Sequence, residues 1–211
     1  MAEASEGDVL MYFVLTEGSP PIAAESLSSL QGADARLMKG FIEGRYFDAE
    51  NFGLSFELND DEGSTDPKDT VTEDTEKRSF ERWRSLKPAE PKPTPPFKAE
   101  PADVTISRLI DASSPVLIKH LLDVRQFHQA VVVKRTRIGR TGMMSAILRM
   151  EFNKVWIKAI EWEDGDTVRE TCRFKFASVT TTYVRRKLDG TVASLWPCEW
   201  VGQVEAQGTG G

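Results

Sequence analysis

Apolar and polar residues alternate through most of the C-terminal half of the chain. Between residues 144 and 200, apolar side chains recur at every second position, as at Met150 and Phe152. A period of two places neighbouring side chains on opposite faces of a β-strand, so this stretch is predicted to be almost entirely strand. Two Asp-Gly pairs, at 164–165 and 189–190, interrupt it, and their glycines can adopt the positive φ of a tight hairpin turn. The pattern predicts a meander of long antiparallel strands.

The apolar phase changes within one of these strands. Phe174 and Phe176 share one parity, whereas Val179 and Tyr183 fall on the other. One extra residue near 177–178 keeps the apolar side pointing inward, so we predict a β-bulge there. A bulge bends a strand and raises its twist, which a sheet needs in order to curl into a barrel or a split sandwich.

Earlier segments add shorter strands and one helix. Ser114 in the N-cap position and Pro115 at the first helical position are typical of a helix start, and the leucines that follow make an apolar face, which predicts a helix at about 114–123. Residues 22–38 have a weak pattern that fits either a short helix or a packed loop, and Gly53 is a candidate bulge position. Strands are predicted at Val9–Leu15, Gly44–Leu58, Val104–Leu109 and Gln129–Ile138.

A long inserted loop, residues 59–101, separates two of these strands. Its first part, 60–76, carries eight acidic residues against Lys68 alone, and its last part has six prolines between Pro88 and Pro101. Neither composition forms a core. A length of 211 residues suits one domain with a large insertion or two small domains, and we predict a single mainly β domain, 1–211. We expect a small antiparallel β-barrel, split or sandwich-like, with one flanking helix and a short tail at 201–211.

Two aromatic residues stand out within the loop. Phe80 and Trp83 lie three apart in the basic stretch 77–86, which predicts one or two turns of amphipathic helix. The pair can dock on its own barrel or on a neighbouring subunit, or remain in a disordered loop. We take Phe80 and Trp83 as candidate subunit or ring-stacking contacts.

Charge is distributed unevenly. The net charge is −6, and because the acidic run 60–76 contributes −7, the rest of the chain is nearly neutral. This balance gives no electrostatic case for binding nucleic acid. A basic cluster nevertheless occupies one segment, and we interpret it as the solvated face of a strand or a subunit contact, with the acidic run as its candidate complement. The cluster consists of Lys134, Arg135, Arg137 and Arg140.

No constellation of residues predicts catalysis, a metal site or a cofactor. His120 and His128 lack ligand spacing to a carboxylate or a cysteine, and no phosphate-binding or dinucleotide motif occurs. Cys172 and Cys198 are expected to be reduced, buried thiols. No apolar run is long enough to cross a membrane, and the acidic N-terminus predicts no cleaved export signal. We therefore expect neither an enzyme nor a membrane-anchored protein.

The order of these elements resembles a known family. The stretches VTISRLIDASSPVLIKHLL at 104–122 and FKFASVTTTYVRRKLDG at 174–190, with the closing Glu199-Trp200, are similar to the haemolysin-coregulated protein family, Hcp, of bacterial type VI secretion systems. The resemblance covers residues 104–200 well and 9–15 and 44–58 weakly. The sequence departs from the family at the inserted loop 59–101, which is longer here, at some 43 residues.

The resemblance implies a structural function. Hcp subunits form hexameric rings, and the rings stack into a hollow tube that a contracting sheath expels, with a spike protein at the tip and small effectors in the lumen. It implies assembly in the bacterial cytoplasm, followed by delivery without a cleaved signal peptide.

Two other functions compete with the tube subunit. The first is a stand-alone β-barrel that binds a partner protein through residues 77–101 and forms no tube. The second is a family member with a catalytic extension, but the 11 residues after Trp200 leave no room for a toxin domain in this chain.

Overall fold

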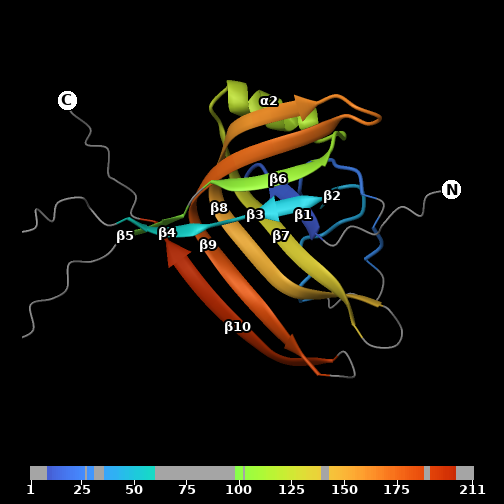
Figure 1. Cartoon of the computed structure of the whole chain (residues 1–211), viewed down its shortest axis with the longest axis vertical. Helices are drawn as coiled ribbons and strands as arrows, with labels where there is room; N and C mark the ends of the chain where they lie inside the picture. The colour runs from blue at the N-terminus through green and yellow to red at the C-terminus, as the bar shows by residue number, and fades with distance from the viewer. Residues whose placement is uncertain are drawn as a thin grey trace, which may run out of the picture. The chain divides into compact units, whose positions relative to one another are not determined.

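Long antiparallel strands dominate the computed structural model of the chain (Figure 1), which describes residues 9–26, 28–30, 36–59, 98–101, 103–138, 143–187 and 191–202. The chain divides into two units, one of Met1–Ser55 with Ala102–Gly211 and the other of Phe56–Pro101. The larger unit contains β1 (Val9–Val14), β2 (Phe47–Ala49), β3 (Asn51–Gly53), β6 (Val104–Leu109), α2 (Ser114–Leu122), β7 (Gln126–Ile138), β8 (Met143–Glu163), β9 (Arg169–Arg186) and β10 (Val192–Val201).

One sheet in the larger unit closes almost completely on itself. Its strands follow the order β2-β1-β7-β8-β9-β6-β3, and β10 pairs with the second half of β9. Because β2 and β3 follow each other in the chain, the two ends of this order meet, and the Glu50 amide donates to the Ser107 carbonyl at 2.8 Å. This confirms the predicted mainly β barrel with one flanking helix.

The first strand is buried on both faces, which explains its unbroken apolar run. Met11 and Phe13 point into the barrel core with Phe152 and Phe174, whereas Tyr12 belongs to a second core on the outer side of the sheet. Apolar side chains on the segment before β2 cover this second core. A strand with cores on both sides carries no alternation, because neither face meets water.

Two buried arginines hold this covering segment. Arg149 donates from Nη1 to the Leu37 carbonyl at 2.6 Å, and Arg135 donates from Nη1 to the Ser29 carbonyl at 3.0 Å. The described part of 22–38 forms no helix but a packed segment with a turn at its end, which decides between the two predicted alternatives. Arginine suits this task because its long side chain reaches carbonyls on an irregular segment and satisfies them.

The predicted change of face in β9 is confirmed, but the predicted bulge is wrong in form. Phe176 and Val179 both point into the barrel core despite their opposite parity. The β8–β9 register stays unbroken from Leu148 to Ile157, so both strands change face together where Lys154 adopts a φ of 51°. The actual shift in pairing lies on β8, just after Ile157. Because β8 and β9 change face together, β9 needs no extra residue near 177–178.

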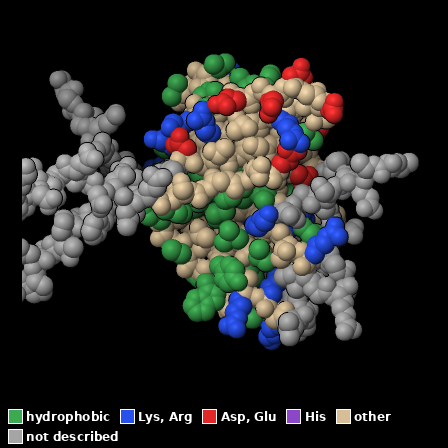
Figure 2. Space-filling view, in the orientation of Figure 1, with side chains coloured by type: hydrophobic (Ala, Val, Ile, Leu, Met, Phe, Trp, Pro, Cys, Tyr) green, Lys and Arg blue, Asp and Glu red, His purple; other side chains and the backbone are tan. Residues whose placement is uncertain are grey.

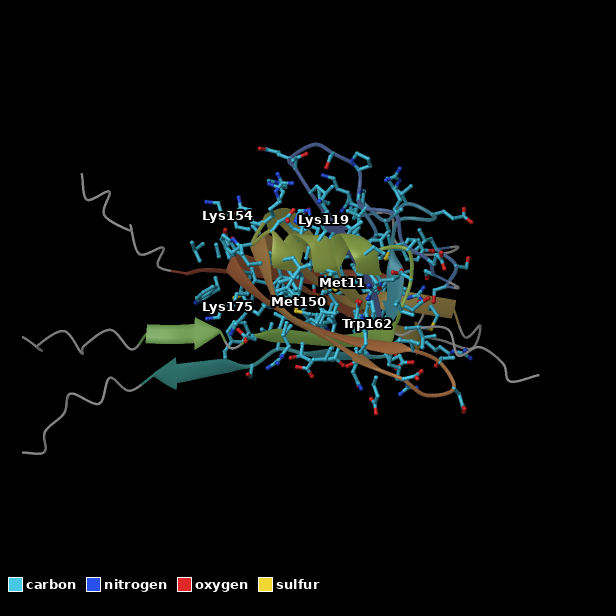
Figure 3. All side chains as sticks on the ribbon, turned by 90° about the horizontal axis from the view of Figure 1, so that it is seen from above. Met11, Lys119, Met150, Lys154, Trp162 and Lys175 are labelled. Atoms are coloured by element: carbon cyan, nitrogen blue, oxygen red, sulfur yellow. The ribbon has the colours of Figure 1, made fainter. Side chains whose placement is uncertain are left out.

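The helix starts one residue earlier than the sequence suggests. Ser113, and not Ser114, is the N-cap residue, and its side chain does not cap the helix because its hydroxyl donates to Asp111 Oδ1 at 2.6 Å. Leu117 is buried and packs into the barrel core. Seen from above, α2 lies across the barrel (Figure 3), with Met11 and Met150 labelled in the interior. The helix therefore closes one end of the core.

The helix ends in a Schellman motif with an unusual residue. Arg125 donates from its amide to the His120 carbonyl and Val124 to the Leu121 carbonyl, at 2.9 and 3.2 Å. Val124, at the C′ position, has a φ of 52° and is 81% exposed. This left-handed conformation costs an L-residue roughly 1–2 kcal/mol, which is why glycine is usual there.

Val124→Gly is expected to raise the free energy of unfolding by about 0.5–1 kcal/mol. Glycine removes the left-handed penalty, and its greater freedom in the unfolded chain offsets part of that gain. Urea unfolding followed by circular dichroism measures the change. Val124→Ala is the matched control, because alanine loses the same exposed methyl groups but keeps the penalty; an equal gain for both variants contradicts the explanation.

The smaller unit is a two-stranded ribbon at the ends of the inserted segment. Its strands β4 (Phe56–Asn59) and β5 (Lys98–Pro101) are antiparallel, with Phe56 opposite Pro101. Of the inserted loop predicted at 59–101, Asn59 and Lys98–Pro101 lie in these strands. Phe80, Trp83 and the predicted helix at 77–86 lie outside the described residues.

Candidate interaction surface

The barrel core continues along the inner face of the sheet onto β10. Three cross-strand rows run from β8 through β9 to β10, and each places one residue from each strand on the same face. In order from the core outwards, the rows are Phe152–Val179–Trp200, Met150–Thr181–Cys198 and Leu148–Tyr183–Trp196. Directly opposed residues in a sheet lie in contact distance, so each row is a continuous strip.

Exposure rises from row to row. Phe152 and Val179 are buried, whereas Tyr183 is 53% exposed and Trp196 62% exposed. We call Leu148, Tyr183, Trp196 and Cys198 the open face. Trp196 donates from Nε1 to Ser194 Oγ at 2.9 Å, which fixes its ring at the surface. Large exposed aromatic residues on a sheet are typical of surfaces that bind another protein.

Among the residues that the structure describes, the same sheet has free edges on two sides. β10 pairs only with β9, and β1 pairs with β7 only as far as Lys134, so residues 135–138 of β7 have no strand beside them on that side in the described part of the chain. Pro197 lies within β10, where it removes one backbone donor, as proline does on edge strands. Contacts at β10 therefore depend more on side chains than on a continuous ladder.

The predicted basic cluster is not one exposed surface. Arg135 is 1% exposed and bonded to the Ser29 carbonyl, so the expectation that it lies on a solvated face is wrong. It shares the face of Val131 and Val133, which the segment before β2 covers, and it lies opposite Ala146. Lys134 is partly exposed and Arg137 is exposed, whereas Arg140 lies outside the described residues. For Lys134 and Arg137, a role in subunit contacts stays a prediction.

Sequence reasoning missed two basic residues that the fold brings to the same end of the sheet. Arg185 and Lys187 are exposed and follow Tyr183 at spacings of two, which places them on the open face. Figure 2 shows Lys and Arg side chains beside hydrophobic ones at this end, whereas the acidic side chains in view gather at the other. The signal was present in the alternation of β9, but it became visible only with the pairing of β9 with β8 and β10.

A buried ionic cluster holds the opposite end of the barrel. Arg108, fully buried, donates to Glu170 Oε1 from Nε and Nη2 at 2.9 and 2.7 Å, and to Asp111 Oδ1 from Nη1 at 2.7 Å. Ser114 Oγ accepts from Nη2 at 2.9 Å, and Trp162 Nε1 donates to Glu170 Oε2 at 3.0 Å. The cluster ties β6, β8 and β9 to the start of α2.

The surroundings of Asp111 favour its charged form. Burial alone raises the pKa of Asp111, but the Arg108 guanidinium and hydrogen bonds from Ser113 and the Glu25 amide hold that pKa below its ordinary value. Arg108 also lies 4.2 Å from the centre of the Phe47 ring. Every polar partner here belongs to the fold, so the cluster positions strands and leaves no group directed at a ligand.

Reactive side chains do not gather anywhere in the described part of the chain. No group of three or more His, Cys, Asp or Glu residues there is placed to hold a metal ion. Burial raises the pKa of Cys172 to about 12, so this thiol is inert. Cys198 is exposed, which contradicts the expectation that both thiols are buried. Among the described residues, no helix is long and apolar enough to cross a membrane.

Comparison with known proteins points to one family. A family model described as "Type VI secretion system effector, Hcp" matches residues 90–183. No curated protein matches the chain by sequence.

Solved structures share the fold. A type six secretion system protein is 14% identical with a TM-score of 0.59, over 91% of this chain and 94% of that one. A type VI secretion system effector from Yersinia pestis is 16% identical with a TM-score of 0.54, over 92% and 99%. Hcp1 from Salmonella typhimurium is 14% identical with a TM-score of 0.53, over 92% and 95%. The chain is thus similar to Hcp proteins of type VI secretion systems in the sequence of residues 90–183 and in its fold.

Proposed function

We propose that this protein is the ring-forming subunit of a type VI secretion tube, with six copies in a ring and rings stacked into a hollow tube. The observation that supports this best is the sheet with two different free edges, at β10 and at the end of β7. Two unlike patches on one subunit produce heterologous contacts, and such contacts close into rings when the rotation allows it. The shared Hcp fold makes six the expected number.

Exposed apolar side chains next to the β10 edge support such a contact. Leu195 and Val201 are 41% and 63% exposed and share the outer face of β10. Leaving them in water in a free subunit is unfavourable, by roughly 25 cal/mol for each Å² that a partner covers. We therefore place Leu195 and Val201 in the contact with the neighbouring copy, where they are buried.

Leu195→Glu together with Val201→Glu is expected to convert rings into monomers. Each new carboxylate must lose its hydration in the contact, whereas in the free subunit it stays in water. Light scattering after size exclusion measures the mass, and circular dichroism verifies the fold. Glu161→Gln with Glu163→Gln, on the exposed end of β8, is the matched control; rings that persist in the first variant place the contact elsewhere.

The remaining partners follow from the same proposal. In this function the tube exterior contacts the contractile sheath, the stack ends at a spike protein, and the lumen carries small effectors. The subunit assembles in the bacterial cytoplasm and leaves with the tube. The alternative, a stand-alone binding module that uses 77–101, predicts a monomer at every concentration.

A further inference from the structure

The open face lies in a field of positive charge. Lys134 stands directly opposite Leu148, while Arg185 and Lys187 follow Tyr183 on the same face. The surrounding stretches 134–148, 178–187 and 191–198 contain no acidic residue. Arg185 and Lys187 are exposed cations beside exposed aromatic rings and attract anionic groups, and Asp189 is the one acidic residue in the sequence from 178 to 198.

This charge has its complement within the same sequence. Residues 60–76 carry eight acidic residues and one lysine, and they account for the negative charge of the whole chain. The segment has few apolar residues, so charge dominates any contact that it makes. A basic face and an acidic run on one chain are drawn together whenever two copies meet.

We propose that the open face binds the acidic run 60–76 of a second copy, with Arg185 and Lys187 pairing with its carboxylates across the Tyr183 and Trp196 rings. The proposal rests on the proposed function in one respect, since a tube holds copies beside each other at high effective concentration. The contact adds an electrostatic link between subunits to the one at the sheet edges. It weakens with salt, because the Debye length falls from about 8 Å at 0.15 M to about 3 Å at 1 M.

Cys198 supplies a native reporter for this contact. It is exposed and lies on the open face two residues from Trp196, so a bound segment shields it from an alkylating reagent. Cys172 is buried with a pKa of about 12, and it serves as an internal control that reacts only when the protein unfolds. The chain has no other cysteine.

The experiment compares the alkylation rate of Cys198 in the full chain and in a variant whose eight acidic residues in 60–76 are changed to Asn or Gln. At low salt, Cys198 of the unaltered chain is expected to react about tenfold more slowly, the effect of a few exposed charge pairs together. The difference disappears in 1 M NaCl. Protection rises with protein concentration, because the run comes from another copy.

Two charge variants separate this face from general electrostatics. Arg185→Glu with Lys187→Glu keeps the acidic run and is expected to lose the protection. Lys119→Glu with Lys175→Glu, at exposed cations that Figure 3 labels on α2 and on β9, is expected to keep it. A synthetic 60–76 peptide, added to the neutralised variant, restores protection in low salt.

Four results overturn the inference. The first is an equal rate in the unaltered and neutralised chains, and the second is protection that does not change with concentration, which assigns the run to its own chain. The third is a control pair that loses protection as fully as Arg185 and Lys187 do. The fourth is stronger protection by a single-stranded oligonucleotide than by the peptide. Mass measured in parallel keeps the tests apart: rings without protection refute this contact alone, whereas monomers without protection refute the proposed function as well.

Discussion

Arg108→Met is expected to lower the free energy of unfolding by about 3–5 kcal/mol, because it removes the cation and leaves two carboxylates in the protein interior. Glu170 is fully buried and Asp111 nearly so, and Arg108 satisfies both of them. Methionine fills the volume but donates no hydrogen bond. Urea unfolding at neutral pH and fixed protein concentration measures the loss.

The pH dependence distinguishes lost charge pairing from lost packing. Asp111 has a lowered pKa in the intact protein, so its contribution to stability is present above the ordinary aspartate pKa and is lost as the pH falls below it. The difference in free energy of unfolding between Arg108→Met and the unaltered protein is therefore expected to become smaller as the pH falls. Arg108→Met with Glu170→Met recovers part of the loss, since the unpaired carboxylate is gone.

An exposed pair on the same sheet provides the control. Arg173 and Glu161 lie 2.7 Å apart, but their side chains are 47% and 64% exposed. Arg173→Met is expected to cost less than about 1 kcal/mol, because water already solvates both charges. A loss for Arg108→Met as small as that of Arg173→Met contradicts the role given to the buried cluster.

Phe152→Ala is expected to lower the free energy of unfolding by about 3–5 kcal/mol as well, because it opens a cavity at the centre of the barrel. Phe152 is fully buried, and its ring centre lies 5.5 Å from that of Phe174 and 4.8 Å from that of Phe176. Aromatic neighbours held by paired strands do not collapse into the space. Urea unfolding again measures the change.

Trp156→Ala tests whether position or ring size decides the effect. Trp156 lies on the same strand but is 37% exposed on the outer side of the barrel. Trp156→Ala is expected to lower the free energy of unfolding markedly less than Phe152→Ala does, although the tryptophan ring is larger. Equal losses for the two variants contradict the assignment of β8 faces to core and solvent.

Periodicity along the chain was sufficient to predict the barrel strands and the helix. Alternation at 144–162 and the apolar run at β1 correspond to real strands, because burial on one or both faces imposes those patterns. The wrong predictions concern residues whose role depends on a partner far along the chain. Ser113 bonds to Asp111 within the Arg108 cluster instead of capping the helix, and that cluster forms only when β6 and β9 pair.

The candidate surface was harder to predict for the same reason. Arg135 was expected on a solvated face of an alternating basic segment, but the segment before β2, far away in the sequence, covers that face of β7. The sequence analysis did not select Arg185, and the pairing of β9 with β10 places it on the same face as Tyr183 and Trp196. Strand pairs join residues that are tens of positions apart, so a surface patch on a sheet appears only with its register.

The mass and shape of the purified protein test the tube-subunit proposal most directly. Light scattering coupled to size exclusion, followed by negative-stain images, is expected to give particles of six subunits with a central hole, since the sheet offers two unlike edges that close into a ring. A monomer that persists at high protein concentration, with no ring in the images, contradicts the proposal.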